Sequence, residues 1–165
     1  MEQAPIPENE KERICAVEGL ELLDTAFEER FDRITKEACN RFSVPISTIT
    51  LVDKDREWFK SVQGLDTREG PRSISFCGHA LMSQVIMIIG DTLKDPRFAD
   101  NPMVKGEPFI RFYAGKSLYD RDSHLPVGVF CIKDKKPREM SPTDISDFLD
   151  LAHRAEEEIN KKVEG

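Results

Sequence analysis

A thiol and an imidazole stand two residues apart near the middle of the chain, in the heptapeptide SFCGHAL (residues 75–81). On a helix, side chains two positions apart point about 200° from each other, so Cys77 and His79 cannot both reach one substrate or one metal ion. The pair also supplies too few ligands for zinc, which needs three or four, and no base or oxyanion donor is marked beside Cys77. We therefore expect no metal site and no catalytic residue, and predict a short helix, capped by Ser75, that forms one wall of a pocket.

Arg97 is a second candidate for contact with a ligand. It lies in DPRFADNP (residues 95–102), where Phe98 is expected to anchor the loop to the core. A guanidinium can hold a carboxylate or a phosphate through two parallel hydrogen bonds. The alternative interpretation is an internal ion pair with Asp91 or Asp100.

Arg111 and Tyr113 are candidates from a predicted strand. They alternate with Phe112, so both face one side of the sheet while Phe112 faces the other. If their side lies beneath the loops, they offer a charge and a hydroxyl group to a ligand. Otherwise they form solvent-exposed or dimer surface.

The composition suits one globular domain, because 39% of the 165 residues are hydrophobic and 33% are charged. The net charge of −7 argues against a general nucleic-acid or anionic-membrane binder, since both require a basic surface. No apolar stretch approaches the roughly 18 residues of a membrane span, and the acidic start does not resemble a signal peptide. Four separate cysteines are then expected to stay reduced, which predicts a cytoplasmic protein.

Apolar residues recur at helical spacing in three segments. The first segment is residues 9–23. The second follows Thr25 and Glu28, which match a capping box and predict a helix that ends before residue 45. The third follows Ser141, a predicted cap with proline at the first helical position.

Strands are predicted between these helices. Residues 46–62 alternate around a polar turn and predict a β-hairpin. Residues 85–91 are nearly all apolar, so we expect a strand buried on both faces. Residues 110–119 and 127–133 predict a second hairpin. Helices at both ends of hairpin-linked strands indicate an α+β fold, with an antiparallel sheet and helices packed on one face.

Two connections, residues 64–84 and 92–109, are far longer than the usual four to six residues. Loops of such length in a compact domain commonly carry function or short helices. They are the expected cover for the second face of the sheet, and a cavity beneath them is the default ligand site.

A resemblance to the GAF domain is carried by motifs in this order: ELLDTAFEERFDRITKEACNRFSVPISTITLVDKDREWFKSVQGLDTRE, SISFCGHAL, DTLKDPRFADNPMV, IRFYAGKSL and VGVFCIKDKKPREMS. The branch it resembles is found beside bacterial sensor histidine kinases and diguanylate cyclases. The resemblance extends over residues 10–155 and implies a central antiparallel sheet of five or six strands. It further implies N- and C-terminal helices on one face, with loops and short helices over a pocket on the other. We assign residues 1–9 to a flexible arm and 10–163 to a single GAF domain.

The resemblance implies a non-catalytic sensory module of signal transduction, as in two-component systems. It also implies that the module binds a small molecule beneath the 64–84 and 92–109 loops and forms homodimers through its terminal helices. A histidine kinase or cyclase is the expected output partner. The chemical identity of the ligand, and any cofactor, stays open. The predicted ligand contacts are Phe76, Cys77, His79, Asp91, Arg97, Phe98, Arg111 and Tyr113.

Two alternative functions stay open. Some GAF proteins reduce free methionine-(R)-sulfoxide with cysteines, and Cys77 is the candidate nucleophile; however, Cys131 falls in the last strand and no resolving partner is evident. The second alternative is a ligand-free dimerisation scaffold. Its cavity would be filled by aromatic side chains, namely Phe76, Phe98, Phe109 and Phe112.

Overall fold

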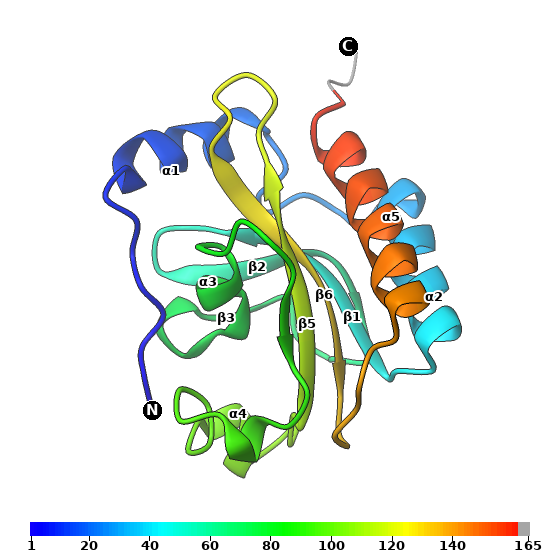
Figure 1. The fold of residues 1–165 in the computed structure, drawn as a ribbon. Coiled ribbons are helices and arrows are strands. Elements are labelled where there is room, and N and C mark those ends of the chain that lie inside the picture. The colour runs from blue at the N-terminus through cyan, green and yellow to red at the C-terminus, as the bar shows by residue number, and fades with distance from the viewer. Residues whose placement is uncertain (162–165) are drawn as a thin grey trace.

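One antiparallel sheet of six strands organises the computed structural model, which describes residues 1–161 (Figure 1). The strands are β1 (Ile46–Val52), β2 (Arg56–Gln63), β3 (Glu69–Pro71), β4 (Met87–Ile89), β5 (Phe112–Tyr119) and β6 (Pro126–Asp134). Across the sheet they lie in the order β3-β2-β1-β6-β5-β4. Both predicted hairpins are present, as β1/β2 and β5/β6, and the predicted α+β class is confirmed.

Two long helices, α2 (Glu29–Phe42) and α5 (Pro142–Ile159), lie side by side on one face of the sheet (Figure 1). Their buried positions recur at the spacing of a helix that packs by one face. These positions are Phe31, Ile34, Thr35, Ala38 and Phe42 in α2, and Phe148, Leu151, Ala152, Ala155 and Ile159 in α5. As predicted, Ser141 caps α5, because its Oγ accepts the Asp144 N–H at 3.1 Å. A third helix, α1 (Glu10–Gly19), contacts β6, where the buried Arg13 donates to the Pro126 carbonyl at 3.4 Å.

Short helices and loops cover the opposite face. They are η1 (Arg72–Ile74), α3 (Phe76–Ala80), η2 (Thr92–Lys94) and α4 (Pro102–Lys105), and all fall within the two long connections. Ser75 caps α3 as predicted, since its Oγ accepts the Gly78 N–H at 2.9 Å. A second hydrophobic core joins α3 and the loops to the sheet, separate from the core beneath α2 and α5.

The predicted capping box at Thr25 and Glu28 is wrong, because α2 begins only at Glu29. Both side chains are bound to Lys60 instead. Thr25 Oγ1 accepts from Lys60 Nζ at 2.7 Å, and a Glu28 carboxylate oxygen pairs with the same nitrogen at 2.7 Å. The side chains that the local sequence predicts to cap a helix therefore bind a residue of a distant strand instead.

The predicted strand over residues 85–91 is shorter and more exposed than expected. β4 forms an edge of the sheet and pairs only with β5 among the described strands. Met87 and Ile89 are buried, but Ile88 is 38% exposed. An apolar run alone does not distinguish an edge strand from a central one.

The N-terminal segment, residues 1–9, lies against the loop-covered face of the domain (Figure 1). The Ala4 N–H donates to the Ser73 carbonyl at 3.0 Å, and the Glu2 N–H donates to the Arg97 carbonyl at 3.2 Å. The flexibility of this arm stays a prediction. Residues 162 and 163 of the predicted domain range lie outside the described residues.

Candidate functional site

The candidate site is a layer of polar side chains between α3 and the centre of the sheet. The register of β1, β6 and β5 sets Thr48 opposite Cys131 and Tyr113 opposite Lys133. Opposed residues of a sheet share one face. These four side chains therefore gather on the face that α3 covers with Cys77.

Gly115 makes room for the Tyr113 ring in this layer. A Cβ atom at position 115 would lie 2.3 Å from the Tyr113 hydroxyl oxygen, far inside any real contact. Gly115 is the β5 neighbour of Cys131, so the Tyr113 ring lies along its own strand, over Gly115, with its hydroxyl near the thiols.

Hydrogen bonds link the thiols and hydroxyls of the site, all of them buried. The Tyr113 hydroxyl donates to Cys77 Sγ at 3.2 Å. Thr48 Oγ1 lies 3.0 Å from Cys131 Sγ and 2.7 Å from Thr50 Oγ1. The Cys77 thiol donates to Thr50 Oγ1 at 3.9 Å. Cys77 and Cys131 belong to the same buried cluster, and the prediction that Cys77 has no resolving partner stays a prediction.

Two charged residues are buried beside these groups without an ion pair. Lys133 is 2% exposed and Glu57 is 3% exposed. Lys133 Nζ lies 5.9 Å from the centre of the Tyr113 ring, but makes no hydrogen bond or ion pair with residues 1–161. Glu57 Oε1 is buried and has no hydrogen-bond partner there either. The layer thus holds one carboxylate oxygen without a hydrogen-bond partner, beside a buried lysine whose charge interacts with Glu57.

Burial and mutual charge shift the ionisation of these groups. Burial raises the pKa of Glu57, against the opposing charge of Lys133. Burial favours neutral Lys133, but Cys131, Glu57 and Cys77 together raise its pKa above the ordinary value. Burial likewise disfavours a Cys131 thiolate, yet the neighbouring Cys77 thiol and the Lys133 charge bring the pKa of Cys131 down to about 7. Lys133 and Cys131 therefore favour each other's charged forms.

Aromatic rings close the site above the thiols. Phe76 stacks on Phe98 with ring centres 4.5 Å apart, and on Tyr113 at 5.1 Å. The His79 ring meets the edge of Phe98 at 4.8 Å, and its Nε2 lies 3.1 Å from the Glu2 carbonyl oxygen of the N-terminal segment. Five predicted ligand contacts, Phe76, Cys77, His79, Phe98 and Tyr113, are thus brought together.

Phe109 and Phe112 do not fill this space, although the scaffold alternative expected both to do so. Phe109 is 46% exposed, and Phe112 belongs to the core beneath the helices. Only Phe76 and Phe98 of that predicted set pack beneath the loops.

The other three predicted contacts lie at the margin of the site and are paired with protein groups. Arg111 donates to Asp91 at 3.1 Å. Arg97 pairs with Asp95 at 2.8 Å rather than with either aspartate considered from the sequence. Asp95 lies only two residues away and also accepts the Arg97 backbone N–H at 2.9 Å, so the local turn provides the partner.

Sequence reasoning missed Glu57, Lys133, Thr48 and Thr50. Thr48 and Thr50 carry one available signal, because polar residues two apart in an apolar strand must share a face. A charged residue inside a predicted strand is a weaker signal. Nothing local indicates that the side chains of Glu57 and Lys133 are buried.

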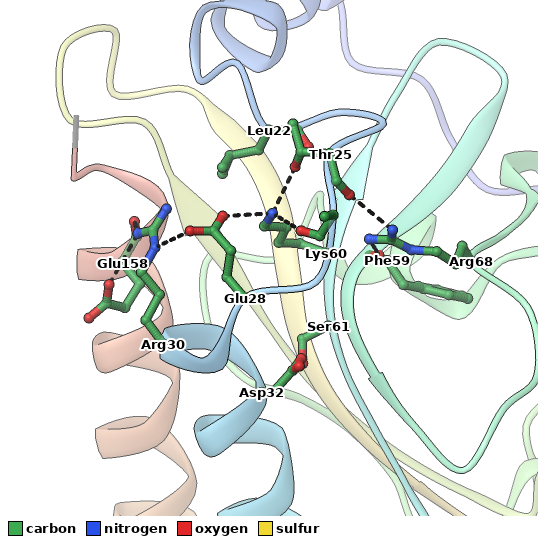
Figure 2. A network of polar contacts seen from close by, with 11 residues as sticks. Leu22, Thr25, Glu28, Arg30, Asp32, Phe59, Lys60, Ser61, Arg68 and Glu158 are labelled. Carbon is green, nitrogen blue, oxygen red and sulfur yellow. Dashed lines mark hydrogen bonds and ion pairs between the residues drawn. The ribbon is translucent and has the colours of Figure 1, made fainter. Parts of the chain in front are cut away.

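A second polar network lies on the opposite side of the sheet, around Lys60 (Figure 2). The register of β1 and β2 shifts between Ile49 and Thr50, pairing them with Ser61 and Phe59 and leaving Lys60 as the extra residue of a bulge. Lys60 Nζ donates to Thr25 and to the Ala26 carbonyl, and it pairs with Glu28. This lysine has a full set of acceptors, so the network is structural.

A GAF domain family model matches residues 26–159. The chain is also similar to the Cyclic di-GMP phosphodiesterase PA2567 of Pseudomonas aeruginosa, with 41% identity over 155 residues. That alignment covers 94% of this chain and 26% of the relative, so the chain spans about a quarter of that protein.

Solved structures of GAF type have the same fold. The GAF domain of an Acinetobacter phosphoenolpyruvate-protein phosphotransferase matches with a TM-score of 0.64 at 14% identity, covering 90% of this chain and 92% of that one. The free methionine-R-sulfoxide reductase of Neisseria meningitidis matches with a TM-score of 0.64 at 18% identity, covering 91% and 89%. Identities this low support the fold alone. None of the helices among residues 1–161 is long and apolar enough to cross a bilayer.

Proposed function

This chain belongs to the GAF domain family, and we propose that it is a non-catalytic sensory module that binds a small molecule beneath α3 and regulates a signalling protein. The phosphodiesterase relative supports a context of cyclic di-GMP signalling, because it is 41% identical over 94% of this chain. We propose a protein that makes or degrades such a dinucleotide as the partner. A histidine kinase partner, the methionine-sulfoxide reductase function and the scaffold function stay predictions.

The buried Glu57 carboxylate, which has an oxygen without a hydrogen-bond partner, and the buried Lys133 beside it carry this proposal. Burying a charge without a partner costs several kcal/mol, so such groups concentrate at functional sites. Lys133 suits an anionic group of a ligand, and Glu57 suits a hydrogen-bond donor. The Tyr113 ring stacks on Phe76, and its hydroxyl donates a hydrogen bond to Cys77, which adds a polar group to the site.

Ligand binding can reach the surface through α3. This helix has five residues, contacts the sheet through Phe76 and Cys77, and contacts the N-terminal segment through His79. A ligand that enters between α3 and the sheet can move α3 only if it binds the domain more tightly with the helix in one position than in another. Only such differential affinity shifts the equilibrium between the two positions. The N-terminal segment then moves with the helix.

Thermal unfolding with defined probes tests the proposal. Cyclic GMP, cyclic AMP and cyclic di-GMP are each titrated against the wild-type chain. At 100 times its Kd a ligand stabilises the folded state by about 2.7 kcal/mol, which raises the Tm by roughly 5–10 °C. We expect this shift with at least one probe, and its loss in Lys133→Met.

Lys135→Met is the matched control, because Lys135 is exposed and lies two residues further along the chain. It should keep the full shift. Absence of a shift with all three probes in the wild type, or an equal shift in Lys133→Met, would contradict binding at this site.

We also propose that the outer faces of α2 and α5 form a homodimer. Most apolar residues of α5 are buried against the domain, but Leu149, on the outer side of the helix, is 37% exposed. Arg154 and Glu37 pair across the two helices at 2.9 Å, which keeps the helices together as one surface. Native mass spectrometry should give a dimer for the wild type and a monomer for Leu149→Lys, with Leu93→Lys as the exposed control.

A further inference from the structure

The N-terminal segment lies across the two long connections that cover the sheet, and it contacts both of them (Figure 1). The Ala4 N–H donates to the Ser73 carbonyl of the first connection at 3.0 Å. The Glu2 N–H donates to the Arg97 carbonyl of the second connection at 3.2 Å. Residues 2–7, which we call the strap, therefore join two loop segments that are far apart in the sequence.

The strap also fits closely against α3. The Glu2 carbonyl oxygen lies 3.1 Å from His79 Nε2, so the strap and the helix share a hydrogen bond. Gly78 faces Ala4 so closely that a Cβ atom on Gly78 would lie 2.6 Å from the Ala4 methyl carbon. The middle of α3 therefore depends on the strap for part of its packing.

The two ends of the N-terminal segment are held with different strength. Pro7 is buried, and Glu10 just beyond it forms an ion pair with Arg72, whose side chain is 4% exposed. The pair at the other end joins the Met1 amino group to Asp100, whose side chain is 61% exposed. Exposed ion pairs contribute little to stability, because water and salt screen them. We therefore expect the strap to leave the surface while Glu10 keeps α1 in place.

We propose that the strap is detachable: it holds α3 and the second connection against the sheet, and it frees α3 when it leaves. In the closed state α3 covers the polar layer of the candidate site, and Cys77 has no exposed surface. Release removes the contacts at Gly78 and His79, so α3 keeps only the packing of residues such as Phe76 on the sheet. A helix of five residues is not stable without tertiary packing. The use of this opening by a ligand rests on the proposed function, whereas the release itself does not.

Hydrogen exchange of the full chain, measured without a ligand, tests the proposal. Ala4→Pro removes the N–H that donates to Ser73. Ile6→Pro is the matched control, because the Ile6 N–H donates to no group among residues 1–161 and Ile6 is 66% exposed. Both positions precede a proline, so the backbone there is extended and suits the φ of proline. We expect residues 73–82 to exchange about tenfold faster in Ala4→Pro than in the wild type.

The control and the sheet decide how this result is interpreted. Ile6→Pro should leave the exchange of residues 73–82 unchanged, and β5 and β6 should be unaffected in both variants. Unchanged exchange of residues 73–82 in Ala4→Pro, or equal acceleration in Ile6→Pro, would overturn the proposal. Acceleration throughout β5 and β6 would overturn it too, because the strap would then be part of the core rather than a detachable cover.

Alkylation of Cys77 shows whether α3 leaves the sheet. Cys15 and Cys39 are first replaced by serine in every variant, and N-ethylmaleimide is added to the folded chain. We expect peptide mapping to show Cys77 alkylated about tenfold faster in Ala4→Pro, and at the wild-type rate in Ile6→Pro. Faster hydrogen exchange with unchanged alkylation would overturn the opening of α3. Neither readout involves a ligand, so a failure of the proposed function leaves both results intact.

Discussion

Two lysines are buried on opposite faces of the sheet, and only one of them is paired. Lys60 is 0% exposed, and its ammonium meets the Thr25 hydroxyl, the Ala26 carbonyl and the Glu28 carboxylate (Figure 2). Lys133 is 2% exposed and has no such partner within residues 1–161. A buried charge with its hydrogen bonds satisfied can stabilise a fold, whereas an unpaired one weakens it. The difference indicates a structural role for Lys60 and supports the proposed ligand contact at Lys133.

Lys60→Met should give the largest loss of stability. The substitution leaves the Thr25 hydroxyl and the Ala26 carbonyl without a donor, and removes an ion pair of Glu28. We expect a loss of about 3 kcal/mol in the free energy of unfolding, seen in urea titration, and a fall in Tm of roughly 6–12 °C. Lys54→Met, at an exposed position, is the control and should stay within about 0.5 kcal/mol of the wild type.

Lys133→Met should give a much smaller change under the same conditions. Lys133 has no hydrogen bond or ion pair to lose, but its raised pKa means that the surrounding groups favour the charged form, so the variant should lose about 1 kcal/mol. The same urea titration measures both variants. Equal losses for Lys60→Met and Lys133→Met would break the comparison, because Lys133 would then be a structural residue too.

The pH dependence of stability should differ in sign between the two faces. Hydrogen bonds from Arg30 and Lys60 lower the pKa of Glu28 below 4.5, so its contribution is present above pH 4.5 and is lost as the pH falls below that value. Burial raises the pKa of Glu57 above 4.5, so protonated Glu57 favours the folded state and stability is lost as the pH rises through the raised pKa.

Glu28→Gln should therefore lower the free energy of unfolding at pH 7, and lower it less at pH 3. Glu57→Gln should raise the free energy of unfolding at pH 7 and leave its value at pH 3 nearly unchanged. Urea unfolding between pH 3 and pH 7 measures both variants. If both variants changed the free energy of unfolding at pH 7 in the same direction, the opposite roles given to Glu28 and Glu57 would be contradicted.

Local sequence predicted those parts of the fold that depend on local interactions. Ser141 caps α5 through Asp144, and Ser75 caps α3 through Gly78, because capping joins residues three positions apart. The same reasoning failed at Thr25, whose hydroxyl binds Lys60 from a distant strand.

The candidate site was predicted in part for a similar reason. Motif and alternation identified Cys77 and Tyr113, which do meet at 3.2 Å. Cys131, Lys133 and Glu57 join them only through the register of β1, β2, β5 and β6. Register is set by pairing between distant strands, so single residues in the sequence did not reveal that these residues share one layer or that the two charges are buried.

A ligand site at Lys133 is tested most directly by asking whether the purified chain carries a ligand whose binding depends on this lysine. Native mass spectrometry compares the folded and denatured masses of the wild type, Lys133→Met and the exposed control Lys135→Met. We expect additional mass on the folded wild type and on Lys135→Met, lost on denaturation, and no additional mass on Lys133→Met. A bare wild type, or the same additional mass on Lys133→Met, would contradict a ligand site built on this lysine.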